Sequence, residues 1–214
     1  MNEQINNRIE LERKFWNSKA KSYDKVVSKF LPKFYETILV NLIQDVSQSK
    51  KVLDAAAGTG ILSIEMSEHV SHITAIDIAP EMLNVAKEKS TRMQKHNIDF
   101  EVGDICNLKF DNKSFDTVVA SNVLHLLFNP EIALQEISRV LTDQGKIITA
   151  TGCYGANLRA KILSQIFALL GQKARSRWSQ KSLKEFIENN GFAITKEVYI
   201  NGMIPLAYLV ASKK

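Results

Sequence analysis

Apolar residues in the first 46 positions recur at steps of three and four residues. An α-helix completes a turn in about 3.6 residues, so this spacing predicts helices that each have one apolar face. Pro32 divides the stretch, because proline is disfavoured inside a helix. The two faces consist of Phe15, Trp16, Ala20, Tyr23, Val27, Phe30 and Leu31, and of Phe34, Ile38, Leu39, Leu42 and Ile43.

From residue 47 onward, short apolar runs rich in β-branched residues alternate with helical stretches. Strands joined by helices form a parallel sheet covered on both faces, so the pattern predicts a doubly wound α/β fold. The predicted strands are 51–54, 72–77, 98–102, 115–120, 146–151, 193–199 and 206–212. The predicted helices are 61–69, 80–94, 130–141, 156–170 and 182–190.

Local signals mark several element ends. Asn129 is a suitable cap for the helix that follows it, and Asp143–Gly145 is typical of a turn into a strand. Ser182 and Glu185 have the spacing of a capping box, and Asn190–Gly191 is expected to end the same helix.

Composition narrows the class of protein. The chain has 214 residues, 45% hydrophobic and 24% charged, which is typical of one folded domain. The net charge of +5 is mild and no Lys/Arg stripe with aromatics occurs, so no nucleic-acid partner is expected. Two cysteines, and four histidines without ligand spacing, predict no metal site. The polar N-terminus and the lack of an apolar run of about 18 residues predict neither a signal peptide nor a transmembrane segment, and hence a cytoplasmic protein.

The residues after each strand are the candidates for function, because ligands of an open parallel sheet bind beyond the carboxyl ends of its strands. The first strand leads into Asp54-Ala-Ala-Ala-Gly-Thr-Gly60, whose small residues permit a sharp turn and close approach of a ligand. The following helix presents free N–H groups at its start. Taken alone, the segment is also compatible with a plain strand-to-helix turn.

Acidic residues follow the next two strands. Asp77 lies 23 residues beyond Asp54, where a carboxylate can accept both hydroxyls of a ribose. Its alternative role is an N-cap before Pro80. Asp104 can accept from an adenine amine while Ile105 covers the ring, although a turn would also account for these two residues.

The glycine loop differs from that of a dinucleotide site. The Gly-x-Gly-x-x-Gly fingerprint needs a third small residue for helix–strand packing. Counted from Gly58 this position is Ser63, and counted from Ala56 it is Ile61. A nicotinamide-dependent oxidoreductase is therefore the weaker interpretation.

Several ordered motifs resemble those of class I S-adenosylmethionine-dependent methyltransferases of the small-molecule, type 11-like group. The motifs are Val52–Gly60, Ile76–Leu83, Gly103–Ile105, Phe115–His125, Glu136–Ile148 and Trp16–Asp24. The resemblance spans about residues 15–212 and departs from the family at Ala56, where glycine is usual. It implies a seven-stranded, mostly parallel Rossmann-like sheet with its last strand antiparallel, inserted between strands 5 and 6, together with N-terminal helices and a helical lid insertion after strand 5.

The resemblance also implies one methyltransferase domain over residues 1–214. Its expected parts are an N-terminal helical cap (1–46), a cofactor-binding core (47–152), a lid or substrate insertion (153–178), and a C-terminal helix with two strands (179–214).

The implied cofactor is S-adenosyl-L-methionine, with S-adenosyl-L-homocysteine as product. Asp77 would hold the ribose hydroxyls and Asp104 the adenine amine, with Ile105 beside the ring. The other implied cofactor-binding residues are Tyr23, Asp54, Ala55, Ala56, Gly58, Gly60, Ile78, Met82, Ser121 and Asn122.

The implied reaction is in-line attack by a small-molecule acceptor on the sulfonium methyl, and alignment of the reactants supplies much of the acceleration. A base is needed only if a proton leaves. His125 is the first candidate for that base or for a substrate contact, with packing at the pocket wall as its alternative. Tyr23 is the second candidate, and its alternative is packing on a helix face.

Residues 156–170 place apolar side chains on one face, and Lys173, Arg175, Arg177 and Trp178 follow. This predicts either a lid over a hydrophobic, lipid-like or anionic acceptor, including one drawn from a membrane surface, or a core-packed helix with a solvated basic loop. No oligomeric state is predicted. A cofactor-binding regulatory protein without catalysis is the main alternative function. Nucleic-acid methylation is disfavoured, since no Pro-Pro-Tyr type of motif follows the fourth strand.

Overall fold

The computed structural model describes residues 2–169 and 174–214. Lys173, one of the cations predicted to follow the lid helix, lies outside the described residues. The chain separates into two compact units, Met1–Ile105 and Cys106–Lys214. The boundary between them falls inside the predicted cofactor-binding core, and the four-part division of the domain stays a prediction.

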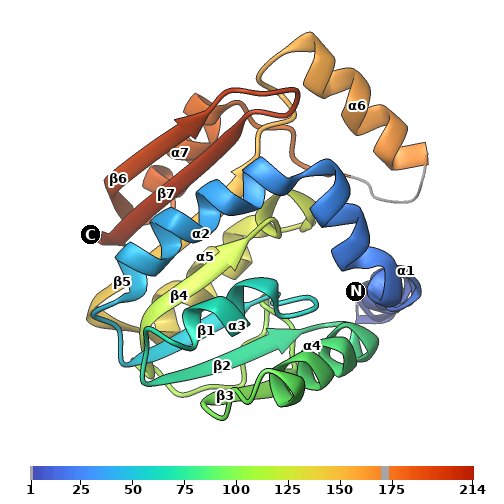
Figure 1. Ribbon diagram of the computed structural model, residues 1–214. Helices are drawn as coiled ribbons and strands as arrows, with labels where there is room; N and C mark the ends of the chain where they lie inside the picture. Colours follow the sequence, from blue (N-terminus) through green and yellow to red (C-terminus); the bar gives the residue numbers. More distant parts are fainter. Residues whose placement is uncertain (1, 170–173) are drawn as a thin grey trace. The chain divides into compact units, whose positions relative to one another are not determined.

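Two helices open the N-terminal unit, as the apolar spacing predicts (Figure 1). They are α1 (Asn2–Phe30) and α2 (Pro32–Val46), and Pro32 occupies the first turn of α2. The buried side chains of α2 are Ile38, Leu42 and Val46, four residues apart, which is the spacing of one helix face.

The rest of this unit alternates strands and helices. The elements are β1 (Lys51–Ala55), α3 (Ile61–Met66), β2 (His72–Asp77), α4 (Pro80–Arg92) and β3 (Ile98–Val102). Both strand pairs are parallel, with Ala55 opposite Ile76 and Asp77 opposite Val102. The strands therefore end at the same edge, and the residues that follow them are brought together.

The C-terminal unit holds the other four strands. Its elements are β4 (Phe115–Ser121), a 3₁₀ turn η1 (Leu124–Leu126), α5 (Pro130–Val140), β5 (Leu141–Gly152), α6 (Leu158–Leu169), α7 (Gln180–Asn189), β6 (Phe192–Ile200) and β7 (Leu206–Lys213). β4 is parallel to β5, and β7 is antiparallel to both β5 and β6. The strand order is β3-β2-β1-β4-β5-β7-β6, which confirms the predicted seven-stranded sheet with its last strand inserted antiparallel.

Three local predictions in this unit are wrong. The capping box of α7 uses Ser179 and Ser182, each accepting from the other's backbone N–H, and not Ser182 with Glu185. The Asp143–Gly145 turn is a bulge within β5, between the pairs Phe115–Leu141 and Thr117–Lys146. Asn129 precedes α5 without a capping hydrogen bond from its side chain.

No helix within residues 2–169 and 174–214 combines the length and apolar character that a membrane crossing requires.

Candidate functional site

The loop after β1 is held by the end of β2. The backbone N–H groups of Ala56 and Ala57 both donate to the Ile76 carbonyl, at 2.9 and 2.8 Å. The loop then turns through left-handed backbone at Gly58 and Gly60, with φ of 56° and 73°. A Cβ built on Gly58 would meet no heavy atom within 4 Å, so space is open beside this residue. A ligand can therefore approach the backbone closely here.

Ala56 occupies the position at which the family usually has glycine, and it has a φ of 75°. For a residue with a Cβ, left-handed backbone costs roughly 1–2 kcal/mol. The conformation thus explains the preference for glycine, and the loop of this chain keeps its shape at an energetic cost.

Gly60 ends the loop against α4. A Cβ at this residue would lie 2.9 Å from the Cβ of Ala86, which is too close. Glycine at position 60 therefore serves both the left-handed turn and the packing of the loop on α4.

Asp77, at the end of β2, joins the loop to the start of α4. Its Oδ2 accepts from the Gly58 N–H at 2.8 Å and its Oδ1 from the Ala79 N–H at 2.9 Å. Burial raises the pKa of Asp77 above its ordinary value, while the N–H donors of Ala79, Gly58 and Ile78 oppose the rise. Each carboxylate oxygen has a second lone pair, so both can also accept from neighbouring hydroxyls of a ligand.

Asp54 is almost fully buried at the end of β1, and Ser63 of α3 donates to its Oδ2 at 2.5 Å. Burial raises the pKa of Asp54 to about 7, although the Ser63 hydrogen bond lowers it. The hydroxyl at position 63, where a dinucleotide site would have glycine or alanine, thus has a specific partner. The structure gives a physical reason for the departure from that fingerprint.

The third acid lies after β3. The Gly103 N–H donates to the Asp77 carbonyl at 3.0 Å, so the chain leaving β3 stays beside the end of β2. Asp104 is half-buried there and Ile105 is buried. The structure thus places Asp54 and Asp77 at the carboxyl ends of β1 and β2, and Asp104 just beyond that of β3, three adjacent parallel strands.

Helix α1 packs on the start of α4 through an apolar cluster. Ala20, Ala79 and Met82 are buried in it, and four half-buried residues pack against it: Trp16, Tyr23, Ile78 and Val85. Met82 is only 2% exposed, so it forms part of the wall between the two helices. Ile78 is the more accessible of the two side chains predicted to contact adenine.

Helix α1 makes polar contacts with the loops that follow the strands, and the sequence did not predict them. Arg13 Nε donates to the Ile78 carbonyl at 3.1 Å, and Asn17 Oδ1 accepts from the Glu81 N–H at 3.0 Å. No sequence signal pairs residues 64 and 65 positions apart, so only the fold reveals these contacts.

Asp24 makes two further contacts of this kind. It accepts from the Thr59 hydroxyl of the glycine loop at 2.5 Å and from Lys89 Nζ of α4 at 2.6 Å. Asp24 belongs to the N-terminal motif, so here a sequence signal was available. Helix α1 is thereby fastened to the glycine loop and to both ends of α4.

Tyr23 of α1 packs against the same apolar cluster, and its hydroxyl is 3.1 Å from that of Tyr35. Burial raises the pKa of Tyr23 well above its ordinary value, and the neighbouring Tyr35, Asp77 and Asp24 add to the rise. The phenol is therefore neutral at physiological pH. It can donate or accept a hydrogen bond but is poorly suited to act as a base.

The remaining predicted residues belong to the C-terminal unit. Asn122 has a φ of 53°, and its N–H donates to the Ala150 carbonyl at 2.7 Å. The Ser121 hydroxyl oxygen is buried without a hydrogen-bond partner in the part of the chain that the structure describes. Both residues lie at the carboxyl end of β4, as predicted.

His125, in η1, is 3% exposed, and its ring centroid is 5.5 Å from that of Tyr154. Burial lowers the pKa of His125 to about 4, so the imidazole is neutral at physiological pH. Its Nδ1 has no hydrogen-bond partner among the described residues. This environment favours a neutral hydrogen-bonding group over a base that titrates near pH 7.

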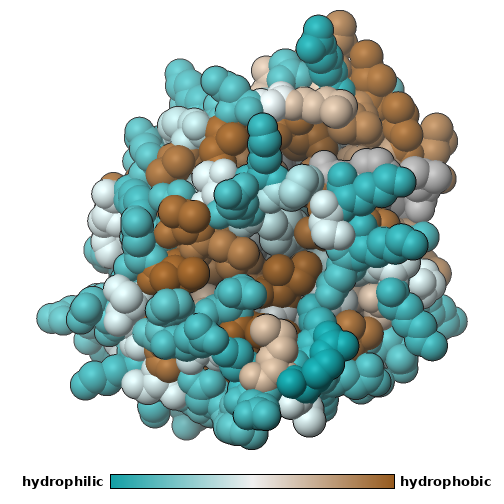
Figure 2. Space-filling model, in the orientation of Figure 1, coloured by the Kyte–Doolittle hydropathy of each residue, from teal (hydrophilic) through white to brown (hydrophobic). Residues whose placement is uncertain are grey.

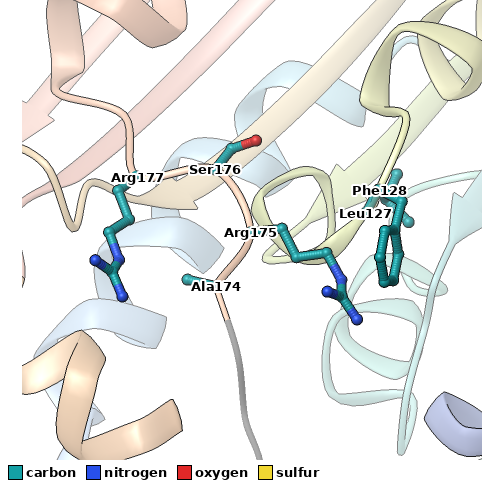
Figure 3. A pocket seen from close by; sticks show the side chains of 6 residues that line it. All are labelled: Leu127, Phe128, Ala174, Arg175, Ser176 and Arg177. Atoms are coloured by element: carbon teal, nitrogen blue, oxygen red, sulfur yellow. The ribbon is translucent and has the colours of Figure 1, made fainter.

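An open pocket of about 490 Å³ lies on the C-terminal unit (Figure 3). It is lined by Leu127, Phe128, Ala174, Arg175, Ser176 and Arg177. The Arg175 guanidinium lies 3.1 Å from the centre of the Phe128 ring. The backbone N–H groups of Arg175 and Ser176 donate to the His125 carbonyl, which fixes this basic segment beside η1.

Comparison with known proteins gives a consistent result. The family model of a methyltransferase domain matches residues 46–191. A demethylmenaquinone methyltransferase of Leptospira interrogans is 34% identical over 153 residues, covering 68% of this chain and 61% of that protein. The matched part is thus less than two thirds of the Leptospira protein. A demethylmenaquinone methyltransferase of Staphylococcus aureus is 27% identical and matches 97% of this chain and 95% of its own length.

Among solved structures, a magnesium protoporphyrin IX methyltransferase from Synechocystis with bound S-adenosylhomocysteine has the same fold. The TM-score is 0.77 at 16% sequence identity, over 94% of this chain and 98% of that one.

Proposed function

The chain belongs to the class I S-adenosylmethionine-dependent methyltransferases, and on this premise we propose that it methylates a small apolar acceptor. The cofactor is the one that defines the family. The apolar, quinone-like acceptor is proposed from the names of the relatives in Leptospira and Staphylococcus. Family membership also sets aside the nicotinamide-dependent oxidoreductase.

The residues of the N-terminal unit fit an S-adenosyl group. Asp77 supports the proposal most directly, because its oxygens are fixed by Gly58 and Ala79 and keep lone pairs for two vicinal hydroxyls. The open space beside Gly58 suits a methionine moiety that approaches the backbone. Asp104 and Ile105 suit the amine and the face of an adenine, and Ile78 a second contact with the ring.

When bound, S-adenosylmethionine supplies a methyl group that the positive sulfur has already activated for nucleophilic attack. The chain's own residues then have to orient the cofactor and exclude water. Asp77 and the loop held by the Ile76 carbonyl provide the orientation. Helix α1, fastened by Asn17 and Asp24, covers the loops on which the ligand rests.

Proton transfer is a secondary requirement in this proposal. Neither His125 nor Tyr23 has a pKa near neutrality, since burial lowers the one and raises the other. We therefore assign His125 to a substrate contact through its neutral imidazole, and Tyr23 to packing and hydrogen bonding beside Asp77. An acceptor that enters as a phenolate needs no base for the attack itself, and where a ring carbon is methylated, the proton on that carbon is lost afterwards to water.

Calorimetric titration with S-adenosylmethionine, S-adenosylhomocysteine and NADH tests the cofactor site. We expect micromolar binding of the first two ligands and none of NADH. Asp77→Asn should weaken binding of S-adenosylhomocysteine about 10- to 100-fold, because hydrogen bonds to a charged group are worth about 1.5–3 kcal/mol. Asp99→Asn, an exposed substitution in β3, is the matched control. Unchanged affinity in the folded Asp77→Asn protein would contradict the assigned site.

A second assay tests the acceptor. The protein is incubated with S-adenosylmethionine and a reduced demethylnaphthoquinone with a short side chain, and products are separated by mass spectrometry. A product heavier by one methyl group supports the proposal. Cofactor binding without methylation of any quinol or phenol would instead support the regulatory-protein alternative.

A further inference from the structure

Helix α6 exposes four of its five large aliphatic side chains, and only Leu163 is half-buried. Leu158, Ile162, Ile166 and Leu169 are 72%, 50%, 47% and 88% exposed. The buried side chains of this helix are Ala160 and Ser164. A surface helix of a globular protein ordinarily has the opposite arrangement, with its apolar stripe toward the core.

The exposed aliphatic side chains form one stripe. At about 100° per residue, positions 158, 162, 166 and 169 fall within an arc of about 80° on the side opposite Ala160 and Ser164. Figure 2 shows these apolar side chains gathered over α6 at the upper right of the molecule. Of the two alternatives for this segment, the core-packed helix with positions 158, 162 and 166 facing inward is thus wrong, because this stripe faces outward.

Positive charges flank the stripe along the chain. The sequence has no acidic residue between Asp143 and Glu185, and eight lysines and arginines in that interval. Arg159 and Lys161, on α6 itself, are exposed. The helix therefore combines an outward aliphatic face with cationic flanks.

The segment 174–177 places two further arginines near α6. Ala174 shares a small cavity with Ser164 and Phe167, which places this segment against α6. Arg175 and Arg177 are both exposed, and Figure 3 shows their guanidinium groups extending away from the backbone. The basic segment thus adds exposed positive charge beside the inner face of α6, while Arg159 and Lys161 flank the stripe itself.

We propose that α6 docks this protein onto the surface of an anionic lipid bilayer. Exposed aliphatic side chains flanked by Lys/Arg bind an anionic bilayer interface through the apolar area that they bury and through attraction to the lipid charges. Leu158, Ile162 and Ile166 enter the acyl boundary in this arrangement, and Arg159 and Lys161 contact lipid phosphates. The proposal rests on α6 and its flanks and does not depend on the identity of the methyl acceptor.

A second copy of the chain fits the same face less well. Two α6 helices packed through their aliphatic stripes would bring Arg159 and Lys161 of each near those of the other, and like charges oppose such contacts. An anionic surface satisfies both the aliphatic stripe and the charge.

Vesicle flotation tests this proposal with the full-length protein. Vesicles of pure phosphatidylcholine and vesicles containing phosphatidylglycerol are compared at physiological salt. We expect flotation with the anionic vesicles and little with the neutral ones. The Ile162→Gln/Ile166→Gln variant should partition at least about tenfold less, because it removes aliphatic surface from the bilayer. The Arg159→Gln/Lys161→Gln variant should partition about 25-fold less, since each cation contributes about fivefold.

The controls separate lipid binding from other effects. Leu11→Gln changes a leucine of α1 that is 68% exposed, and it should float like the wild type. Circular dichroism melts show whether each variant is folded, and light scattering reports its mass. The proposal is overturned if the wild type ignores anionic vesicles, or if the folded Ile162→Gln/Ile166→Gln variant floats equally well. It is also overturned if that variant converts a dimer to a monomer without losing flotation. A wild-type protein that floats with anionic vesicles but transfers no methyl group would contradict the proposed function and leave the docking proposal standing.

Discussion

Replacing Asp54 with asparagine is expected to change how the stability of this protein depends on pH. Asp54 has almost no access to solvent, and Ser63 provides its side-chain hydrogen bond. Burial raises its pKa from 3.8 to about 7. The native state therefore holds a proton on Asp54 at pH values where the unfolded chain has lost it.

The sign follows from this difference in bound protons. A carboxyl whose folded pKa is raised contributes its full stability below the unfolded value of 3.8, and that contribution is lost as pH rises through about 7. At about 1.4 kcal/mol per pKa unit, the loss between pH 4 and pH 8 is about 4 kcal/mol. The asparagine side chain carries no charge at either pH and keeps an oxygen that can accept from Ser63. The free energy of unfolding of Asp54→Asn minus that of the wild type should therefore rise by about 4 kcal/mol from pH 4 to pH 8.

Urea unfolding followed by circular dichroism at pH 4, 5, 6, 7 and 8 measures this effect. The comparison is the difference between Asp54→Asn and wild type at each pH, since Asp77 titrates in both proteins. Asp111→Asn, an exposed substitution, is the matched control. A difference that stays constant to about 1 kcal/mol across the range would refute the reasoning, because the full linkage is about 4 kcal/mol.

Three other predictions concern the same regions. Ala56→Gly should raise the free energy of unfolding by about 0.5–1 kcal/mol in urea melts, because it removes the left-handed strain at φ 75°; a loss of stability would contradict this. Gly60→Ala should lower it by about 2–4 kcal/mol, since the new Cβ meets Ala86 at 2.9 Å and the left-handed backbone at φ 73° adds strain; wild-type stability would show that the loop can shift. The imidazole of His125 should show no NMR titration between pH 6 and 8, because its pKa is about 4, and a midpoint in that range would refute its neutral assignment.

Strands and helices follow the sequence closely where local patterning governs them. Strands 72–77 and 98–102 have the predicted ends, because strand ends coincide with changes from apolar to small or acidic residues. Helix ends are less well predicted, since α3 stops at Met66 and α4 at Arg92. The cap of α7 lies one turn before its predicted position, because Ser179 and Ser182 form the capping box. Spacing alone cannot distinguish this Ser–Ser pair from a Ser–Glu box.

The placement of the acids was predictable from the sequence, and their electrostatics was not. Parallel strands have their carboxyl ends at one edge of the sheet. Once the strand order was known, Asp54, Asp77 and Asp104 therefore had to lie near that edge. The pKa of Asp54 depends on burial by residues distant in the sequence. The Arg13 and Asn17 contacts depend likewise on how α1 packs against α4.

The sequence by itself determined the class of fold and the family, because period and motif order are local properties of the chain. Tertiary structure alone decided which face of α6 is buried. The pattern of α6 is compatible with either face inside, since the helix is apolar on both sides, and packing selected the face with Ala160 and Ser164. Small residues allow close approach to the unit, so Leu158, Ile162 and Ile166 remain at the surface.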